Sequence, residues 1–581
     1  MSDDARIEAN RQLLLEAQKK GGLSKFGAYV KLSGPGWMQS AITLGGGSLS
    51  GSLYLGIVAG VSMIWVQPFA MILGVIMLSA ISYVTLTTGE RPFRLINEHI
   101  NPVLGWSWLI ASLLATMVWA MPQYSLCYGV LEQNLLPSLF HGDGVLAPGP
   151  EGGEDFGKWV VSLVILVICL PVTWSYGSGS VGVKIYEAIL KAVIAMVVLC
   201  FFGVVVRMSM VGDGVDWGGV WSGLMPKWRN LYQPSDTLMP LLEAIVDPAA
   251  RQYWTDAIVS QQRDIMLAAG AAAVGINMTF FLPYNLLTSG WNKDFRSFSI
   301  FDLFTGMFFP FVLATGCVVI AAATQFHAQL PDGCLESGAT VQVPKPLEKG
   351  YQKILSTRQG AMETGKYEMP AEPSLAEANL AAVLIVRDTG DLAKSLEQLF
   401  ADDQGQGGRF FSNIVFGLGV VGMTMSTISV MMLISGFIFC EIFNVSPKGW
   451  AFRLGCLAAT SGALWPIIWE GEHAYLAVPA GVFGAVLLPV AYLTFFLLMN
   501  QKSILGDERP KGMKRILWNT GMLIAVVAAG GAGISAIYKK GGNGGLMFLA
   551  AYVVLVLIVQ VMRKPKHDAP SQDAPNRDAQ A

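Results

Sequence analysis

The sequence predicts an all-α membrane protein with about twelve transmembrane helices. Of its 581 residues, 53% are hydrophobic and only 14% are charged, whereas soluble globular proteins carry about 25% charged residues. Apolar runs of about 20 residues, the length that crosses a bilayer, recur along the whole chain. Two of these runs contain helix-breaking residues near their middles, which points to a transport architecture rather than a simple bundle.

Each apolar run is expected to form one transmembrane helix. The runs are 36–58, 61–86, 105–130, 158–175, 185–207, 266–291, 301–325, 410–439, 450–469, 474–499, 515–536 and 544–562.

The short connections between these runs predict the orientation through the excess of Lys and Arg in cytoplasmic loops. With a cytoplasmic N-terminus, the opposite side receives the acidic stretches EGGEDFG at 151–157 and EGEH at 470–473, with Lys539 and Lys540 as the exception. The cytoplasmic side then receives most basic loop residues: Arg91, Arg94, Lys293, Arg296, Lys448, Lys502, Arg509, Lys511, Lys514, Arg515, Arg563, Lys564 and Lys566. We therefore expect both termini in the cytoplasm and a location in the inner or plasma membrane. The polar N-terminus has no apolar segment ahead of a cleavage site, so it is not a secretory signal.

These spans divide the chain into consecutive segments. They are a cytoplasmic N-terminal segment (1–33), a first repeat of five spans (34–207), an extracytoplasmic loop (208–265), spans six and seven (266–325), an extracytoplasmic insert that we expect to be a solvated cap (326–409), spans eight to ten (410–499), spans eleven and twelve (500–565) and a disordered tail (566–581).

The composition excludes several classes of function. A net charge of −2 gives no reason to expect a nucleic-acid partner. The seven cysteines show neither disulfide nor zinc spacing, and no nucleophile–base set or phosphate-binding loop supports an enzyme or a bound cofactor. The expected partners are an ion or small-molecule substrate and the lipid bilayer, and the chain is expected to be monomeric.

The first broken run contains AITLGGGSLSGSL at 41–53, and the sixth contains Pro283 within GINMTFFLPYNLLTSGW. Backbone groups freed by such breaks are tolerated in a membrane only against protein or a water-filled cavity. Breaks at corresponding places predict a five-plus-five inverted repeat with a binding site between them. The alternative is that the glycines only permit close helix packing and that Pro283 only kinks its helix.

The residues expected around this site are neutral and form hydrogen bonds. They are Gln39, Thr43, Gly45, Gly46, Gly47 and Ser48 from the first span, and Asn277, Thr279, Leu282, Tyr284 and Asn285 from the sixth. The middles of the predicted spans contain no Asp, Glu or His. Transporters of charged species usually keep such groups, so a tightly held, dehydrated cation is not favoured.

The two broken runs and three further segments resemble the Nramp family of divalent-metal transporters. GPGWMQSAITLGGGSLSGSLYLGIVAGVSMIW at 34–65 resembles the family's first helix, and LPYNLLTSGW at 282–291 resembles its sixth. Residues 180–198, 416–429 and 486–498 resemble its fifth, eighth and tenth helices. The resemblance implies the LeuT-like fold of the APC superfamily, with two inverted repeats plus two extra helices, and it implies secondary transport of a divalent metal ion.

The sequence departs from the family at the metal ligands. The family's Asp-Pro-Gly-Asn falls on 45–48, so its metal-binding Asp and Asn are replaced by Gly45 and Ser48. Its metal-binding Met falls on Leu282 and the following His on Tyr284. The acidic pair of its third helix falls around 122–125, where there is no carboxylate.

Three hypotheses therefore remain from the sequence. The first is weak divalent-cation transport, with little proton coupling, through a site of carbonyl and hydroxyl oxygens. The second is transport of a small anionic or zwitterionic organic solute, bound by the bare amides of the GGGS stretch. The third is a membrane sensor that keeps the fold and transports nothing.

Overall fold

The structure is a computed structural model in which almost every element is a helix. It describes residues 3–32, 35–141, 144–147, 156–174, 181–210, 215–337, 340–400, 408–447 and 449–563. The predicted tail at 566–581 and most of the acidic stretch at 151–157 lie outside these residues.

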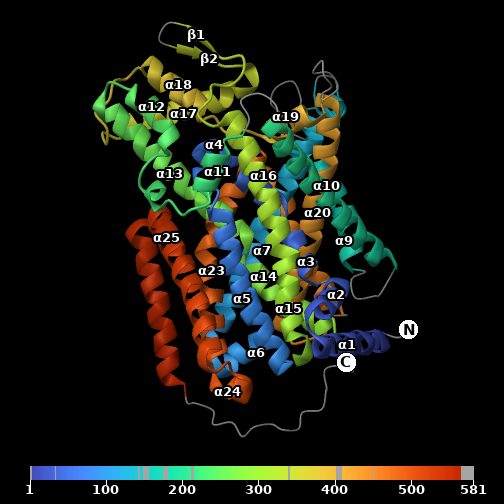
Figure 1. The fold of residues 1–581 in the computed structure, drawn as a ribbon. Helices are drawn as coiled ribbons and strands as arrows, with labels where there is room; N and C mark the ends of the chain where they lie inside the picture. The colour runs from blue at the N-terminus through green and yellow to red at the C-terminus, as the bar shows by residue number, and fades with distance from the viewer. Residues whose placement is uncertain are drawn as a thin grey trace.

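The apolar helices form one bundle (Figure 1). In chain order they are α3 (Pro35–Thr43), α4 (Gly46–Ala59), α5 (Val66–Thr88), α7 (Pro102–Val130), α9 (Phe156–Trp174), α10 (Val181–Met210), α13 (Pro248–Ala273), α14 (Ile276–Thr288), α15 (Arg296–Leu303), α16 (Phe309–Phe326), α20 (Gly408–Phe443), α21 (Trp450–Cys456), α22 (Trp465–Ile468), α23 (Ala477–Asn500) and α25 (Gly512–Met562).

Shorter elements connect these helices or lie outside the bundle. The helices are α1 (Asp3–Lys20), α2 (Gly22–Leu32), α6 (Pro92–Leu95), α8 (Pro137–Phe140), α11 (Trp217–Gly223), α12 (Met239–Glu243), α17 (Lys345–Glu363), α18 (Leu375–Val383), α19 (Thr389–Phe400) and α24 (Lys502–Leu505). Short 3₁₀ or π helices are η1 (Gly60–Met63), η2 (Ile96–Ile100), η3 (Leu131–Leu135), η4 (Trp228–Leu231), η5 (Asp236–Leu238), η6 (Lys293–Phe295), η7 (Phe304–Phe308), η8 (Leu457–Leu464), η9 (Ala474–Leu476) and η10 (Gly506–Glu508). Strands β1 (Leu335–Ser337) and β2 (Thr340–Gln342) pair antiparallel, with Leu335 opposite Gln342.

Each predicted span corresponds to a helix or a pair of helices. Within the described part of the chain, nine helical segments are long and apolar enough to cross a membrane. The broken pair α3–α4 and the helix α10 account for two further predicted spans. The last two spans are the two helices of α25, which meet at a kink where Gly542 adopts φ 54° and ψ −145°. The chain is a multi-pass membrane protein.

The predicted loop between the fifth and sixth spans contains the first part of a long helix. Helix α13 begins at Pro248, with Asp247 as its N-cap accepting from the amide of Ala250, so the loop ends well before residue 265. The first half of α13 carries polar and charged residues, which hid it from a search for apolar runs.

The segment 326–409 is not simply a solvated cap, because part of it shares a second hydrophobic core with the start of α13. Ile245, Trp254 and Ile258 pack there against Tyr351 and Leu380, apart from the core of the bundle. We call residues 328–385, together with α12 and the first half of α13, the cap. Figure 1 shows the cap at one end of the bundle, with α1, α2 and α24 at the other.

Candidate functional site

Both broken helices stop and restart close together inside the bundle. The first span stops at Thr43, where α3 ends, and restarts at Gly46, with Gly45 as the extended N-cap (φ −87°, ψ −177°). The sixth stops at Ala273 and restarts at Ile276, with Gly275 as an equally extended N-cap (φ −83°, ψ 160°). The predicted pair of breaks is therefore present.

The break of the sixth span is not at Pro283, as expected from the sequence. Pro283 lies inside α14, which continues to Thr288. A proline inside a membrane helix can leave only a kink, because neighbouring groups satisfy the freed carbonyl. The chain instead leaves the helix at Val274, whose φ of −144° and ψ of 109° are extended.

The three glycines of the first break are held by close neighbours. The amide of Gly46 donates to Oε1 of Gln123 on α7 at 3.1 Å. A Cβ atom on Gly46 would lie 2.5 Å from Leu126, and one on Gly47 would lie 2.4 Å from the Trp119 ring. The surface of the GGGS stretch is therefore covered by α7 and is not bare.

The Ser48 hydroxyl lies between the carboxyl ends of the two interrupted helices. It donates to the carbonyl oxygen of Thr43, and the carbonyl oxygen of Ala272 is 3.4 Å away. These carbonyls belong to the last turns of α3 and α13, where no helical amide is available to them. The partial negative charge of both helix ends thus meets at one hydroxyl.

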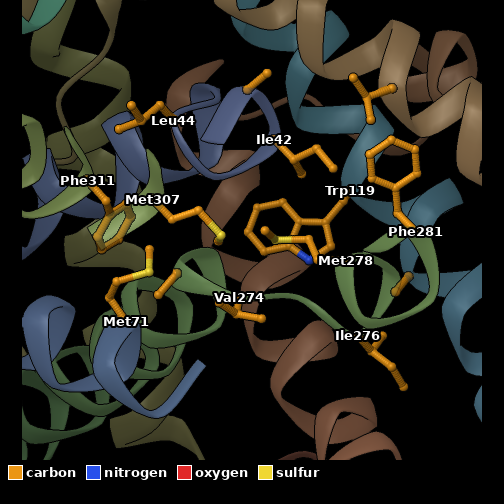
Figure 2. Packing of buried hydrophobic residues seen from close by; sticks show 14 of the residues in the cluster. Ile42, Leu44, Met71, Trp119, Val274, Ile276, Met278, Phe281, Met307 and Phe311 are labelled. Atoms are coloured by element: carbon orange, nitrogen blue, oxygen red, sulfur yellow. The ribbon is translucent and has the colours of Figure 1, made fainter. Parts of the chain in front are cut away.

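Met278 adds a sulfur atom to the same region. The Thr43 hydroxyl lies 3.7 Å from Sδ of Met278, and it also lies 3.0 Å from the carbonyl oxygen of Gln39. Oδ1 of the neighbouring Asn277 accepts from the amide of Met278 at 3.0 Å, within the first turn of α14. Figure 2 shows Ile42, Trp119 and Met278 gathered at this level of the bundle.

A small cavity of about 30 Å³ lies at the centre of these groups. Gly47, Ser48, Asn277 and Met278 line it together with Gln123. A second space of about 20 Å³, lined by Leu44, Gly45 and Ser48 among others, lies on the other side of the break. Such volumes are enough for about one water or one ion each.

Four predicted residues lie away from this cavity, further along α14. The Thr279 hydroxyl accepts from the indole of Trp108 at 2.9 Å, and Leu282 is fully buried. Tyr284 stacks on Phe280 with ring centroids 4.6 Å apart. Asn285 is buried one residue further on. All four follow Gly275, the N-cap of α14, by four residues or more.

Gln39 is fully buried on α3, one turn before the break. Neither its Oε1 nor its Nε2 has a hydrogen-bond partner among the described residues. An unpaired buried amide is costly, so this position is one where a polar ligand or a water would be favourable.

Gln123, Trp119, Thr427 and Met278 line the cavity but were not in the predicted set. Met278 follows Gly275 by three residues, and an isolated glycine inside a helical pattern was the available signal for that break. For Trp119, Gln123 and Thr427 no local signal exists, because they come from α7 and α20 and reach the site only through packing.

The described residues contain no group of three or more His, Cys, Asp or Glu side chains able to hold a metal ion. The expected absence of carboxylates near the breaks also extends to the cavity lining, where all the side chains are neutral. The oxygen and sulfur atoms around this cavity therefore carry only partial charges.

On the side of the cap, a short segment that we call the strap (387–390) crosses the end of the bundle. The Asp388 carboxylate accepts from Nε2 of Gln133 at 2.7 Å and from the amide of Ala474 at 3.0 Å. Oε1 of Gln133 accepts from the Thr389 hydroxyl and from the amide of Gly390. These bonds tie the strap to η3 and to η9, the turn just before α23.

Comparison with known proteins adds independent evidence on the family and the fold. The family model of natural resistance-associated macrophage protein-like (Nramp) proteins matches residues 376–536. A mutant form of the manganese transporter of Eremococcus coleocola is 14% identical and covers 93% of this chain and 95% of its own, with a TM-score of 0.56. The same transporter in complex with an aromatic bis-isothiourea substituted compound gives a TM-score of 0.57 at 14% identity. No curated protein matches the chain.

The resemblance to the Nramp family is confirmed. The chain has the LeuT-like fold of the Nramp transporters, as the first and sixth helices indicated. In that fold the two broken helices occupy equivalent places in the two inverted repeats.

Proposed function

We propose that this chain is a secondary transporter that carries a divalent metal cation between its two broken helices. The meeting of the two carboxyl ends at Ser48 carries this proposal, since the Thr43 and Ala272 carbonyls both face that hydroxyl. Half-helix carboxyl ends and unwound carbonyls are the groups with which transporters of this architecture coordinate cations.

The size of the cavity favours an ion over an organic solute. A volume of about 30 Å³ accommodates an ion or a single water. A carboxylic acid of even a few carbon atoms would require the surrounding helices to separate.

The glycine-rich break offers little to an anion. The amide of Gly46 is already bonded to Gln123, and the amide of Gly45 lies 3.2 Å from the carbonyl oxygen of Ile42. An organic anion at the GGGS stretch remains the second candidate, and it requires Gln123 to release Gly46.

The neutral side chains around the cavity predict weak binding of a divalent cation. They also predict that the preference among cations depends on Met278. Without a carboxylate, a hard ion such as Mg²⁺ must keep several of its waters. The thioether of Met278 favours softer ions such as Mn²⁺ or Cd²⁺ over Mg²⁺. Since no titratable side chain lines the cavity, transport should depend little on a proton gradient.

The decisive experiment is uptake of Mn²⁺, Cd²⁺ and Mg²⁺ into proteoliposomes that enclose a metal-sensitive dye. Saturable uptake above that of empty liposomes is expected. Met278→Leu should reduce Cd²⁺ uptake about tenfold and Mg²⁺ uptake by less than twofold. Met77→Leu, an equally buried methionine on α5, is the matched control and should change neither.

Failure of the folded protein to transport any of these ions would reject the metal proposal. Uptake of a radiolabelled small carboxylate would then support the second candidate, and the absence of all flux would support a sensor.

We also propose that the cap faces the outside of the cell and that α1 lies in the cytoplasm, because α6 and α24, which carry the basic residues Arg94 and Lys502, lie at the end of the bundle opposite the cap (Figure 1). Cys334, in the cap, is the partly exposed one among the cysteines that the structure describes. Labelling of intact cells with a membrane-impermeant maleimide should therefore modify the protein, and Cys334→Ser should abolish the labelling. Labelling only after the cells are broken would place the cap inside.

A further inference from the structure

A large apolar groove of the bundle lies away from the helix breaks, and none of the break residues lines it. It has a volume of about 740 Å³ and runs between α2, α5, α15 and α25. Phe26, Tyr29, Ile76, Phe301 and Trp518 form most of its walls. It is open on one side, at the end of the bundle opposite the cap, so it faces the lipid of that leaflet.

Two lysines stand at this groove, one from each of two distant helices. Lys25 comes from α2 and Lys514 from the first turn of α25. Neither forms an ion pair with a described carboxylate, and Lys25 lies over the Tyr29 ring, 5.3 Å from its centroid. Other cations near this end do have partners: Arg296 lies 3.0 Å from Glu508, and Lys511 lies 3.3 Å from Asp507.

The position of α2 brings Lys25 to the groove. Gly21 and Gly22 adopt positive φ values of 65° and 48°, which turn the chain sharply between α1 and α2. Leu23 and Phe26 on α2 are 90% and 57% exposed. A short helix with exposed apolar side chains and a basic residue beside them is typical of a helix that lies in the membrane interface.

We propose that this groove binds one anionic diacyl phospholipid from the surrounding leaflet. An acyl chain lies along Ile76, Phe301 and Trp518, and the phosphate lies between the ammonium groups of Lys25 and Lys514. Apolar walls alone would accept any lipid, whereas two unpaired cations at the mouth select a headgroup with net negative charge. The proposal does not depend on which substrate the protein transports.

The proposal is tested by native mass spectrometry of the full-length, detergent-purified protein titrated with dioleoyl phosphatidylglycerol or dioleoyl phosphatidylcholine. One phosphatidylglycerol should bind with an apparent Kd lower than that of phosphatidylcholine by on the order of tenfold. The double variant Lys25→Gln/Lys514→Gln should bring the two lipids within about twofold of each other.

The matched control is Lys31→Gln/Lys511→Gln, which removes two exposed lysines from the same end of the molecule without touching the groove. It should keep the preference for phosphatidylglycerol. Gly521→Trp fills the groove, where Ile76 is the nearest side chain, and should weaken the binding of both lipids.

Equal binding of the two lipids to the unmodified protein would overturn the proposal. A preference for phosphatidylglycerol that persists in the Lys25→Gln/Lys514→Gln variant would also overturn it. The same holds for a preference that is lost equally in the Lys31→Gln/Lys511→Gln control. Melting temperatures of all variants, measured without added lipid, separate these outcomes from misfolding.

Discussion

Gly47 shows how one stretch of glycines can serve both packing and the interruption of a helix. Its missing side chain leaves room for the Trp119 ring, which would lie 2.4 Å from a Cβ atom. Gly46 is similarly covered by Leu126, whereas Gly45 is the residue that leaves the helical conformation. The two interpretations of the GGGS stretch, packing and site, therefore apply to different residues of the same stretch.

Replacement of Gly47 by alanine should destabilise the protein by about 1–3 kcal/mol, because the added methyl group overpacks a buried contact. Gly316→Ala on α16 is the control, since a Cβ atom there meets nothing within 4 Å. Thermal unfolding in detergent should show a lower melting temperature for Gly47→Ala and an unchanged or higher one for Gly316→Ala. Equal melting temperatures would mean that Trp119 moves aside at no cost.

A carboxylate at the break should strengthen cation binding, provided that space is made for it. A Cβ atom on Gly45 would lie 2.6 Å from Oγ1 of Thr427, so Gly45→Asp alone should be strained. The double variant Gly45→Asp/Thr427→Ala should lower the apparent KM for Mn²⁺ uptake at least tenfold, since a formal charge now offsets part of the dehydration of the ion. Thr427→Ala alone is the control, and an unchanged KM in the double variant would argue that the ion does not pass this residue.

The sequence located Thr43, Ser48 and Asn277 near the site because glycine and asparagine mark helix interruptions and starts. It did not point to Met278, and Leu282 and Tyr284 lie further along α14 than the small cavity, because a membrane helix can accommodate a proline such as Pro283 without breaking. Contacts such as Gln123 with Gly46 join residues 77 positions apart. Such contacts depend on tertiary packing, which no local pattern in a single sequence encodes.

At the scale of elements, the helix boundaries followed the apolar runs and failed where polarity changed within a helix. The polar first half of α13, which begins at Pro248, is of this kind. Within α25, Gly542 has the backbone conformation that an L-residue rarely adopts (φ 54°, ψ −145°).

The backbone conformation of Gly542 predicts that alanine substitutions at Gly542 and Gly544 have different effects on stability. Gly542→Ala should cost on the order of 1–3 kcal/mol through backbone strain. Gly544→Ala should be neutral or stabilising, since a Cβ atom there meets nothing within 4 Å and the residue is helical with a negative φ. Melting temperatures of the two variants provide the test, and the same loss in both would exclude backbone strain as the cause.

The groups around the strap should make stability fall as the pH rises. Burial, followed by the Asp388 charge, raises the pKa of Glu472 to about 7. The pKa of His473 is also raised: burial acts in the opposite direction, but the hydrogen bond to Glu132 at 3.1 Å and the charge of Asp388 outweigh it. Both groups therefore bind protons more tightly in the folded protein than in the unfolded one.

The sign of the effect follows from this difference. Between pH 4.5 and about 7, folded Glu472 keeps a proton that the unfolded chain has lost, so stability decreases as the pH rises through this range. The contribution of His473 is fully present below pH 6.5 and is lost as the pH rises through its raised pKa. Melting temperatures from pH 5 to pH 8.5 should fall, and Glu472→Gln should flatten the part of this dependence below pH 7. A flat profile in the unmodified protein would contradict the prediction.

At the scale of the whole molecule, the cap is held by a buried ion pair that also touches α13. Nε of Arg358 lies 2.7 Å from Oε1 of Glu377, and the same carboxylate accepts from the indole of Trp254 at 3.1 Å. Two further bonds from Arg358 go to the carbonyl oxygens of Pro370 and Ala371. No apolar pattern could predict this network, since its members are polar and far apart in sequence.

Arg358→Ala should cost about 3–5 kcal/mol, because it leaves the Glu377 carboxylate buried without its partner. Lys511→Ala breaks an exposed pair and should stay within about 1 kcal/mol. Because α13 belongs to both cores, the melting curve of Arg358→Ala should shift as a single transition. A separate early transition would mean that the cap unfolds independently.

The continuity of α13 has a mechanical consequence. One rigid rod reaches from the centre of the cap, at Trp254, to Ala273 at the interruption of the sixth span. A tilt of its inner half by a few degrees would be magnified as a displacement of its outer end. An antibody fragment that binds both the cap and the neighbouring ends of the bundle should hold the outer end of α13 in one position. It should therefore inhibit transport without contacting the cavity.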